Sequence, residues 1–212
     1  MVRVTLVPMR TVLVVRSSED EATAWAAVLD SDSDAFVAIF DKHRDRVYRH
    51  ALRITENVHD AEDVTAGAFL ELWRRQKAVR VVDGSVLPWL LVTTTNLARN
   101  LARSLRRYRS ILAALPRAEN ARSAEEVALE QIEEVRISAQ VREALHTLTP
   151  SDAGLITLIV FEHFSHSQAA LALGISDGAV RTRLHRARTR IATLLSESED
   201  ESNINTSKEA NR

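Results

Sequence analysis

Apolar residues recur at every third or fourth position through most of the chain after residue 20, the spacing of helices with one buried face. One such stripe spans residues 36–54, another spans 64–73, and a third follows Pro88. Two more lie within residues 137–161 and 170–191. The 212 residues include only 5 Gly and 4 Pro, and β-branched runs are scarce after residue 20. These patterns predict an all-α protein.

The length gives room for one large domain or two small ones, and the changes in pattern favour two small helical domains. We expect a disordered N-terminal extension over residues 1–20 and a first helical domain over 21–115. A flexible acidic linker is expected over 116–138, followed by a helix-turn-helix domain over 139–195. An acidic tail over 196–212 is expected to be disordered.

The stretch from Ser165 to Arg190 predicts a helix, a tight turn and a second helix. Gly174 stands after the first helix, where a left-handed residue lets the chain turn sharply. Ser167 and Ser176 are expected to cap the two helices. The second helix carries one apolar stripe, which consists of Val180, Leu184, Ala187 and Ile191.

The opposite face of that second helix has small residues at its start and arginines on both flanks. Such a face suits insertion into a DNA major groove between two phosphate backbones. A helical hairpin with merely solvated arginines is the alternative, but such a face usually mixes Glu with Arg. Here Asp177 is the only acid between Ser176 and Arg190, so we favour DNA binding. The candidates are Ser176, Gly178, Arg181, Thr182, Arg183, His185 and Arg186.

Charge is segregated along the first domain, although the net charge of the whole chain is only −1. Carboxylates crowd residues 60–63 at the start of a predicted helix, where compensation of the helix dipole alone would explain them. The helix opened by Pro88 is different, because no acid occurs between Asp83 and Glu119 while arginines accumulate. A basic helix with amide and aromatic side chains fits a nucleic-acid surface; a long exposed helix with a basic tail is the alternative.

The composition excludes several classes of protein and site. The chain contains no cysteine, which removes disulfides, thiolate metal sites and thiol nucleophiles, and which fits a reducing cytoplasm. An apolar run such as residues 86–92 is far shorter than the roughly 20 residues that span a bilayer. We therefore expect a cytoplasmic protein without membrane insertion.

No pattern in the sequence predicts catalysis. His163 and His166, beside Glu162, could share a helix face as metal ligands, but no third ligand is spaced to join them, and we favour loop-cap histidines. Phosphate-binding glycine loops, Gly-x-Ser-x-Gly and His-Glu-x-x-His are all missing from the sequence. We expect no enzyme activity, no metal and no cofactor.

The order of these features resembles the two-domain RNA polymerase sigma factors of the extracytoplasmic-function (ECF) group. Residues 36–75, with Asp60-Ala-Glu-Asp-Val-Thr65 and Phe69-Leu-Glu-Leu-Trp73, resemble the second conserved region of that family. Pro88-Trp-Leu90 and Asn96-Leu-Ala-Arg-Asn100 resemble its promoter-melting segment. Residues 145–150 and 173–188 resemble its fourth region, so the resemblance covers roughly residues 30–195.

The resemblance implies that the first domain docks on core RNA polymerase and grips the minus-ten element of promoter DNA, while the second domain reads the minus-thirty-five element. It also implies an anti-sigma partner, which nothing in the sequence identifies. The implied polymerase-binding residues are Asp60, Glu62, Asp63, Phe69, Leu72 and Trp73. The implied minus-ten residues are Trp89, Asn96, Arg99, Asn100, Arg103 and Arg106.

Two other functions are compatible with parts of the sequence. One is a helix-turn-helix regulator that binds DNA without engaging polymerase, and the other is a helical interaction protein with no role at nucleic acid. The first domain distinguishes them, because a plain regulator needs neither an acidic docking helix nor a second basic helix.

Overall fold

The computed structural model describes residues 17–114 and 139–209, and these residues are helical apart from turns and one isolated β-bridge between Val82 and Ser85. The all-α prediction is confirmed. The first part contains α1 (Ser18–Leu29), α2 (Ser33–Thr55), α3 (Val58–Arg74), the 3-10 turn η1 (Gln76–Ala78) and α4 (Leu87–Ala114). The second part contains α5 (Ala139–Thr147), α6 (Pro150–Ile156), the π-helical turn η3 (Thr157–Phe161), α7 (His166–Leu173) and α8 (Asp177–Glu209).

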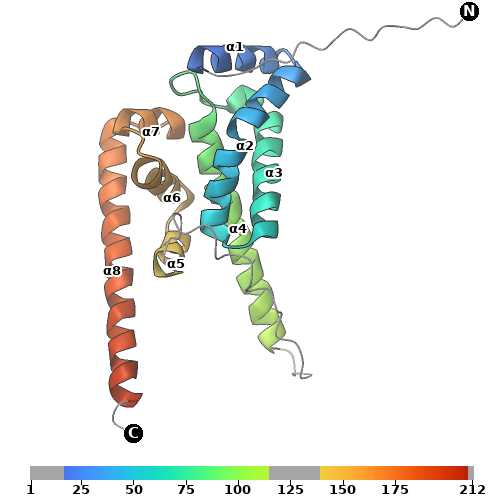
Figure 1. Cartoon of the computed structure of the whole chain (residues 1–212). Helices are drawn as coiled ribbons and strands as arrows, with labels where there is room; N and C mark the ends of the chain where they lie inside the picture. The colour runs from blue at the N-terminus through green and yellow to red at the C-terminus, as the bar shows by residue number, and fades with distance from the viewer. Residues whose placement is uncertain (1–16, 115–138, 210–212) are drawn as a thin grey trace, which may run out of the picture.

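The first domain is a bundle of α2, α3 and α4, with α1 lying across one end (Figure 1). Aromatic rings join α2 to α3. Phe36 meets Trp73 edge-on with 5.0 Å between ring centroids, and Phe40 meets Phe69 at 4.7 Å. The two apolar stripes predicted in this part of the sequence therefore face each other.

The start of α3 differs from the prediction. Asn57 caps this helix, because its side-chain oxygen accepts a hydrogen bond of 2.9 Å from the backbone N–H of Asp60. The helix therefore begins at Val58, and Asp60 is the one acid in its first turn. Among the carboxylates of residues 60–63, compensation of the helix dipole therefore explains only that of Asp60.

The second domain has its own small core and the predicted helix-turn-helix. Its caps follow the sequence with one exception: Ser165, and not Ser167, caps α7, because Ser165 and Gln168 exchange hydrogen bonds in a capping box. Gly174 adopts the expected left-handed conformation with φ of 64°. Ser176 accepts a hydrogen bond from the N–H of Ala179 at the start of α8, as predicted.

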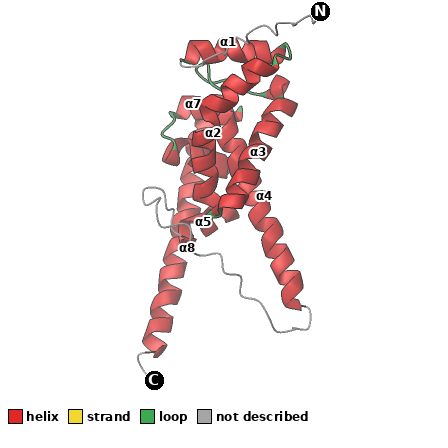
Figure 2. Cartoon of the chain, turned by 45° about the vertical axis from the view of Figure 1, so that its right-hand side comes forward, coloured by secondary structure: helices red, strands yellow, loops and turns green. Residues whose placement is uncertain are grey.

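The two domains pack against each other through α4 (Figures 1 and 2). Leu90 and Leu91 of α4 share one hydrophobic cluster with Leu155 of α6 and Leu158 of η3, and all four side chains are fully buried. Two sequence patterns that predicted separate domains thus contribute to a common core. The predicted linker, residues 116–138, lies outside the described residues, and the domain limits stay predictions.

The ends of α4 and α8 extend beyond this packed body and diverge from each other, as Figure 2 shows. α8 continues to Glu209, so the structure has a helix where we expected a disordered tail from residue 196. The sequence offers a reason, because neither Gly nor Pro occurs after Gly178 to interrupt a helix. The predicted N-terminal extension lies outside the described residues, except for its last four.

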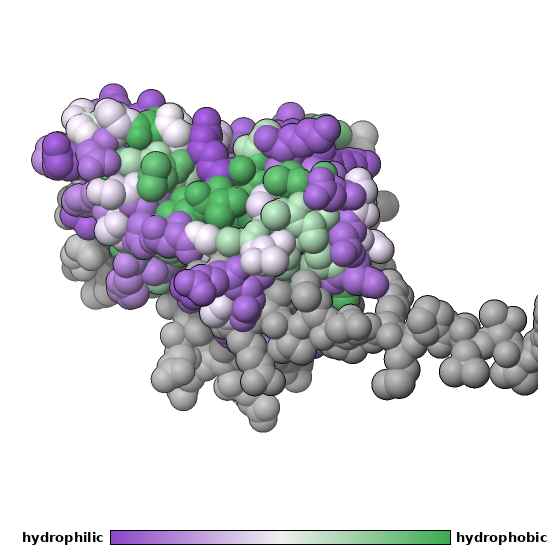
Figure 3. Space-filling model, turned by 90° about the horizontal axis from the view of Figure 1, so that it is seen from above, coloured by the Kyte–Doolittle hydropathy of each residue, from purple (hydrophilic) through white to green (hydrophobic). Residues whose placement is uncertain are grey.

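The opposite end of the molecule presents a hydrophobic area framed by hydrophilic residues (Figure 3). The elements at this end contribute exposed apolar side chains, among them Leu29 of α1, Val81 of the loop before α4, and Leu171 of α7. Within the described residues, no helix has the length and apolar character that crossing a membrane requires.

Candidate nucleic-acid interface

α8 carries its buried residues and its predicted DNA-reading residues on opposite sides. Val180, Leu184 and Ala187 are at most 4% exposed and anchor the helix on the second domain, as the apolar stripe predicted. The residues predicted to face a groove lie on the other side, where all except Arg183 are exposed. Asp177 is the one acid in the first turn of the helix. This surface can therefore approach phosphates with little repulsion.

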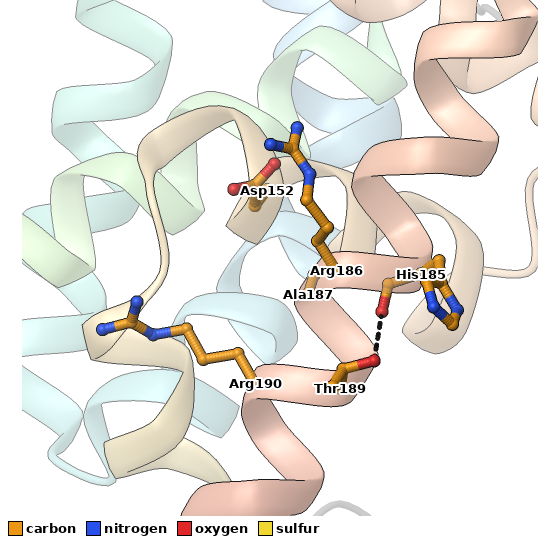
Figure 4. Close-up of a pocket in the computed structure, with 6 residues that line it drawn as sticks. All are labelled: Asp152, His185, Arg186, Ala187, Thr189 and Arg190. Carbon is orange, nitrogen blue, oxygen red and sulfur yellow. Dashed lines mark hydrogen bonds between the residues drawn. The ribbon is translucent and has the colours of Figure 1, made fainter.

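Arg183 and Arg186 reach from α8 toward the first turn of α6. Arg183 donates from Nη1 to Ser151 Oγ at 2.5 Å, and the Arg186 side chain extends toward Asp152 (Figure 4). Asp152 is fixed in turn by Thr149, whose hydroxyl donates to its carboxylate at 2.8 Å. The first turn of α6 thus holds the side chain of Arg183 and lies beside that of Arg186. An open groove of about 470 Å³ beside them is lined by Asp152, His185, Arg186, Ala187, Thr189 and Arg190.

α4 is the second cationic surface, and it contains no acid along its whole length. Asn100, Arg103 and Arg106 are exposed, whereas Trp89 and Asn96 are half-buried. Arg103 donates from Nη2 to the side-chain oxygen of Asn100 at 2.9 Å, so an amide and a guanidinium form one joined polar surface. Such a surface can contact bases and phosphates together.

Arg99 is the exception on α4, because it is only 2% exposed. Its Nε donates to the carbonyl of Leu145 at 3.2 Å, and its Nη2 donates to the carbonyls of His146 and Leu148. These carbonyls lie at the end of α5, where the helix dipole concentrates negative charge. Burial lowers the pKa of Arg99 from its ordinary value. The structure therefore places this predicted DNA-binding residue in the domain interface and not on the surface.

Glu162, which follows η3, makes the second polar contact between the domains. It accepts hydrogen bonds from Arg46 Nε and Nη2 at 3.0 and 2.8 Å, and from Arg53 Nη1 at 3.4 Å. Its side chain is only 7% exposed. Among the described residues, no group of three His, Asp or Glu side chains is arranged to hold a metal ion. Glu162 is therefore a partner of arginines.

Comparison with known proteins places both halves of the chain. The family described as "Sigma-70 region 2" matches residues 39–108, and "Sigma-70, region 4" matches residues 138–191. The ECF RNA polymerase sigma factor SigE of Mycolicibacterium smegmatis is 34% identical over 188 residues, which cover 86% of this chain and 71% of that protein. The chain belongs to the ECF sigma factors.

Other relatives agree with this assignment. RNA polymerase sigma factor CarQ of Myxococcus xanthus is 31% identical over 171 residues, covering 80% of this chain and 94% of that protein. Among similar sigma factors, the share of the relative's own length that is covered ranges from 36% to 97%. The fold is similar to that in the solved structure of CnrH in complex with the cytosolic domain of CnrY, with a TM-score of 0.51 and 22% identity over 84% of this chain and 97% of the matched chain.

As an ECF sigma factor, the protein is a polymerase subunit that directs promoter recognition. This assignment sets aside the regulator that does not engage polymerase and the interaction protein without a nucleic-acid role. Helix α1 and the end of α8 lie outside both matched ranges.

The candidate polymerase-binding residues of this ECF sigma factor do not form one surface. Two of the three carboxylates at residues 60–63 are exposed, and Asp60 is half-buried. Phe69 and Leu72 are 4% and 0% exposed and build the core of the first domain, with half-buried Trp73 packed against it. Their apolar character therefore reflects packing against α2. Leu70, which was not among the predicted candidates, is 49% exposed on the outer side of α3.

The contacts between the domains were also missed. No role was predicted for the arginines of α2, and Glu162 lies 116 residues away from Arg46. No local pattern in the sequence could have paired them. The exposure of Leu70 could have been predicted, because Leu70 lies two turns after Glu62 and one turn after Ala66 on the same side of α3.

Proposed function

We propose that this ECF sigma factor holds promoter DNA at two places, with its first domain on the minus-ten element and its second domain on the minus-thirty-five element. The observation that supports this division is the presence of two separate, acid-poor cationic stretches of helix in one chain, namely α4 and the first part of α8 (residues 177–190). One DNA site would need only one of them.

The second domain would insert the N-terminal half of α8 into a major groove. Arg181, Thr182 and Arg186 project from the exposed side and would contact base edges, each good contact contributing about 1–3 kcal/mol of discrimination. Arg183, which is held by Ser151, would approach the adjacent phosphate backbone from a fixed position.

The first domain would hold the unpaired strand along α4. Asn100 and Arg103 offer amide and guanidinium donors on one exposed surface, and Arg106 extends it by one turn. Trp89, at the start of the helix, offers a partly exposed ring on which a base can stack. These groups suit a strand whose bases have left the duplex.

Core RNA polymerase would contact the outer side of α3. Glu62 and Asp63 present carboxylates there and Leu70 presents an apolar side chain, a combination that fits a partner surface with cationic and apolar parts. An anti-sigma factor stays a prediction for this chain.

Promoter-dependent transcription in vitro with purified core polymerase tests the assignment of α8. The double variant Arg181→Ala/Arg186→Ala should reduce selectivity for a minus-thirty-five element roughly tenfold or more, because both side chains would no longer reach base edges. Arg44→Ala, which removes an exposed arginine of α2, is the matched control and should keep that selectivity. Undiminished selectivity in the double variant would refute the proposed reading surface.

A binding assay with core polymerase tests the assignment of α3. Glu62→Lys/Asp63→Lys should weaken core binding several-fold, because two carboxylates on the proposed contact surface become cations. Asp45→Lys, on an exposed position of α2, is the control. Equal core affinity of the α3 variant and the control would show that polymerase binds elsewhere.

A further inference from the structure

Three arginines of the first domain end on oxygen atoms of the second domain. Arg46 and Arg53 lie two turns apart on α2, and both donate to the carboxylate of Glu162. Arg99, on α4, donates to the backbone carbonyls that end α5. One contact therefore uses a full negative charge, and the other uses the negative end of a helix dipole.

The surroundings of these arginines belong to the same interface. The hydroxyl oxygens of Thr95 on α4 and Thr157 on η3 are 2.8 Å apart in a buried hydrogen bond. The Arg53 guanidinium lies 5.9 Å from the centroid of the Phe161 ring. When the second domain is in place, Arg99 is buried and Arg53 is largely covered.

Covering arginines in this way is costly unless each one has an oxygen partner, which here the second domain supplies. The same guanidinium donors bind phosphate oxygens strongly, singly or in pairs. Glu162 receives two donors of Arg46 on a single oxygen, Oε2, which is how a phosphate oxygen could also be held. The second domain therefore occupies donors that a nucleic-acid backbone would use.

We propose that Arg46, Arg53 and Arg99 form a phosphate-binding surface for the single-stranded part of promoter DNA, and that Glu162 and the end of α5 block this surface when the second domain closes on it. The proposal rests on the proposed role of the first domain at the minus-ten element. Domain closure and strand binding use the same donors, so each excludes the other. The structure is then the closed form, in which the chain restrains its own strand binding.

Removal of the Glu162 carboxylate is the first test. Glu162→Ala should raise the affinity of the full chain for a mixed-sequence single-stranded DNA by roughly fivefold or more, which is the change in affinity that typical coupling between two sites produces. Fluorescence anisotropy at low salt measures this affinity. Glu71→Ala removes the same charge from α3 outside the interface and serves as the control. An affinity of Glu162→Ala no higher than that of the control overturns the proposal.

Addition of Arg46→Ala and Arg53→Ala to the Glu162→Ala chain tests the phosphate contacts themselves. The gain in affinity should disappear, and the slope of log affinity against log salt should become shallower by about 0.7 for each phosphate that the chain no longer neutralises. A purely structural role of these arginines would not change that slope. An unchanged slope therefore refutes direct contact with the strand.

A reversible lock tests the exclusion. Because the chain has no cysteine, Thr95→Cys/Thr157→Cys introduces one pair, at positions whose side-chain oxygens are 2.8 Å apart. The oxidised pair should bind the single strand several-fold more weakly than the reduced pair, and reductant should restore binding. Equal affinity of the two forms overturns the inference.

Transcription by the reduced pair with core polymerase separates this inference from the proposed function. Promoter-dependent transcription by the reduced form, together with equal strand binding by the oxidised and reduced forms, would overturn the inference alone. No promoter-dependent transcription by the unmodified chain would overturn the proposed function, whereas a redox-dependent strand affinity would still support the closed and open forms.

Discussion

A single buried carboxylate, that of Glu21, joins three segments of the first domain. It accepts hydrogen bonds from His43 Nε2 at 2.8 Å, from the Ser85 hydroxyl at 2.9 Å and from the Val86 N–H at 2.8 Å, and it pairs with Lys42 at 2.9 Å. Burial raises the pKa of Glu21, but these partners, led by His43, outweigh burial and lower it from 4.5 to about 2. Helix α1 is thus tied to α2 and to the start of α4.

At this residue we expect a pH-dependent contribution to stability. The native pKa of Glu21 lies below its unfolded value, so the contribution is complete above about pH 4.5 and is lost as the pH falls toward about 2. Glu21→Gln should lower the free energy of unfolding near neutral pH by about 1–3 kcal/mol and remove this acid dependence. Urea unfolding near pH 7 and near pH 3 measures both, with Glu62→Gln, on an exposed residue, as control. Identical acid dependence in Glu21→Gln and the parent chain would contradict the assignment.

A second buried group, His50, should stay neutral in mild acid. Its Nε2 lies 2.8 Å from the Thr95 hydroxyl, and burial, followed by the charges of Arg53 and Arg46, lowers its pKa from 6.5 to about 3. The unfolded chain takes up a proton below pH 6.5 that the native chain does not, so this group reduces stability as the pH falls from 6.5 toward about 3. Histidine-ring NMR signals, assigned with His50→Gln, should show a neutral ring at about pH 5. A titration midpoint of His50 between about 6 and 7 would contradict the prediction of a neutral ring.

Among the elements, α7 shows how local chemistry places a helix end. Ser165 and Gln168 each satisfy the backbone N–H of the other, with hydrogen bonds of 2.8 and 3.2 Å. Ser167, which was predicted to be the cap, lies in the helix and donates to Asp177 at 3.2 Å. The two serines therefore have different roles although they are two residues apart.

This difference predicts unequal effects of matched substitutions. Ser165→Ala should lower the free energy of unfolding by about 1 kcal/mol, because a helix cap is removed. Ser167→Ala should change stability by no more than about 0.5 kcal/mol, as exposed substitutions usually do. Thermal unfolding of both variants checks the order. A larger loss of stability for Ser167→Ala would show that the cap is assigned to the wrong serine.

The whole molecule differs from two independently folded domains, because the cluster around Leu90 and Leu158 belongs to both. Arg99 adds a polar link to the end of α5, and Glu162 adds one to α2. Elements that share a buried core usually unfold together. The described parts of the chain should therefore behave as one cooperative unit in the closed form.

Calorimetry can test this cooperativity. The parent chain should unfold in a single transition, whereas Arg99→Ala should split it into two, because the carbonyls that end α5 lose their buried donor and the domains separate. Arg103→Ala, on the same helix but with an exposed side chain bonded to Asn100, should leave the single transition intact. Two transitions in the parent chain would contradict the shared core.

Much of this fold follows from local sequence signals. The apolar stripes predicted the helices, and Gly174 and Ser176 marked the turn and the start of α8, since φ preference and capping depend on a few neighbouring residues. Residue roles that depend on tertiary packing did not follow. Phe69 was predicted to dock on polymerase, but in the structure its ring packs against Phe40. Arg99 was predicted to contact DNA, but it donates to a carbonyl at the end of α5. Periodicity identifies an apolar side of a helix, but it does not say which neighbour fills that side.

The unbroken course of α8 has a mechanical consequence. Its 33 residues make a rod roughly 50 Å long, at about 1.5 Å per residue. Its first turns carry the proposed reading face, and its last turns extend beyond the packed body. A stiff helix rotates as a single lever, so anything that grips the far end would set the angle at which the reading face meets the groove.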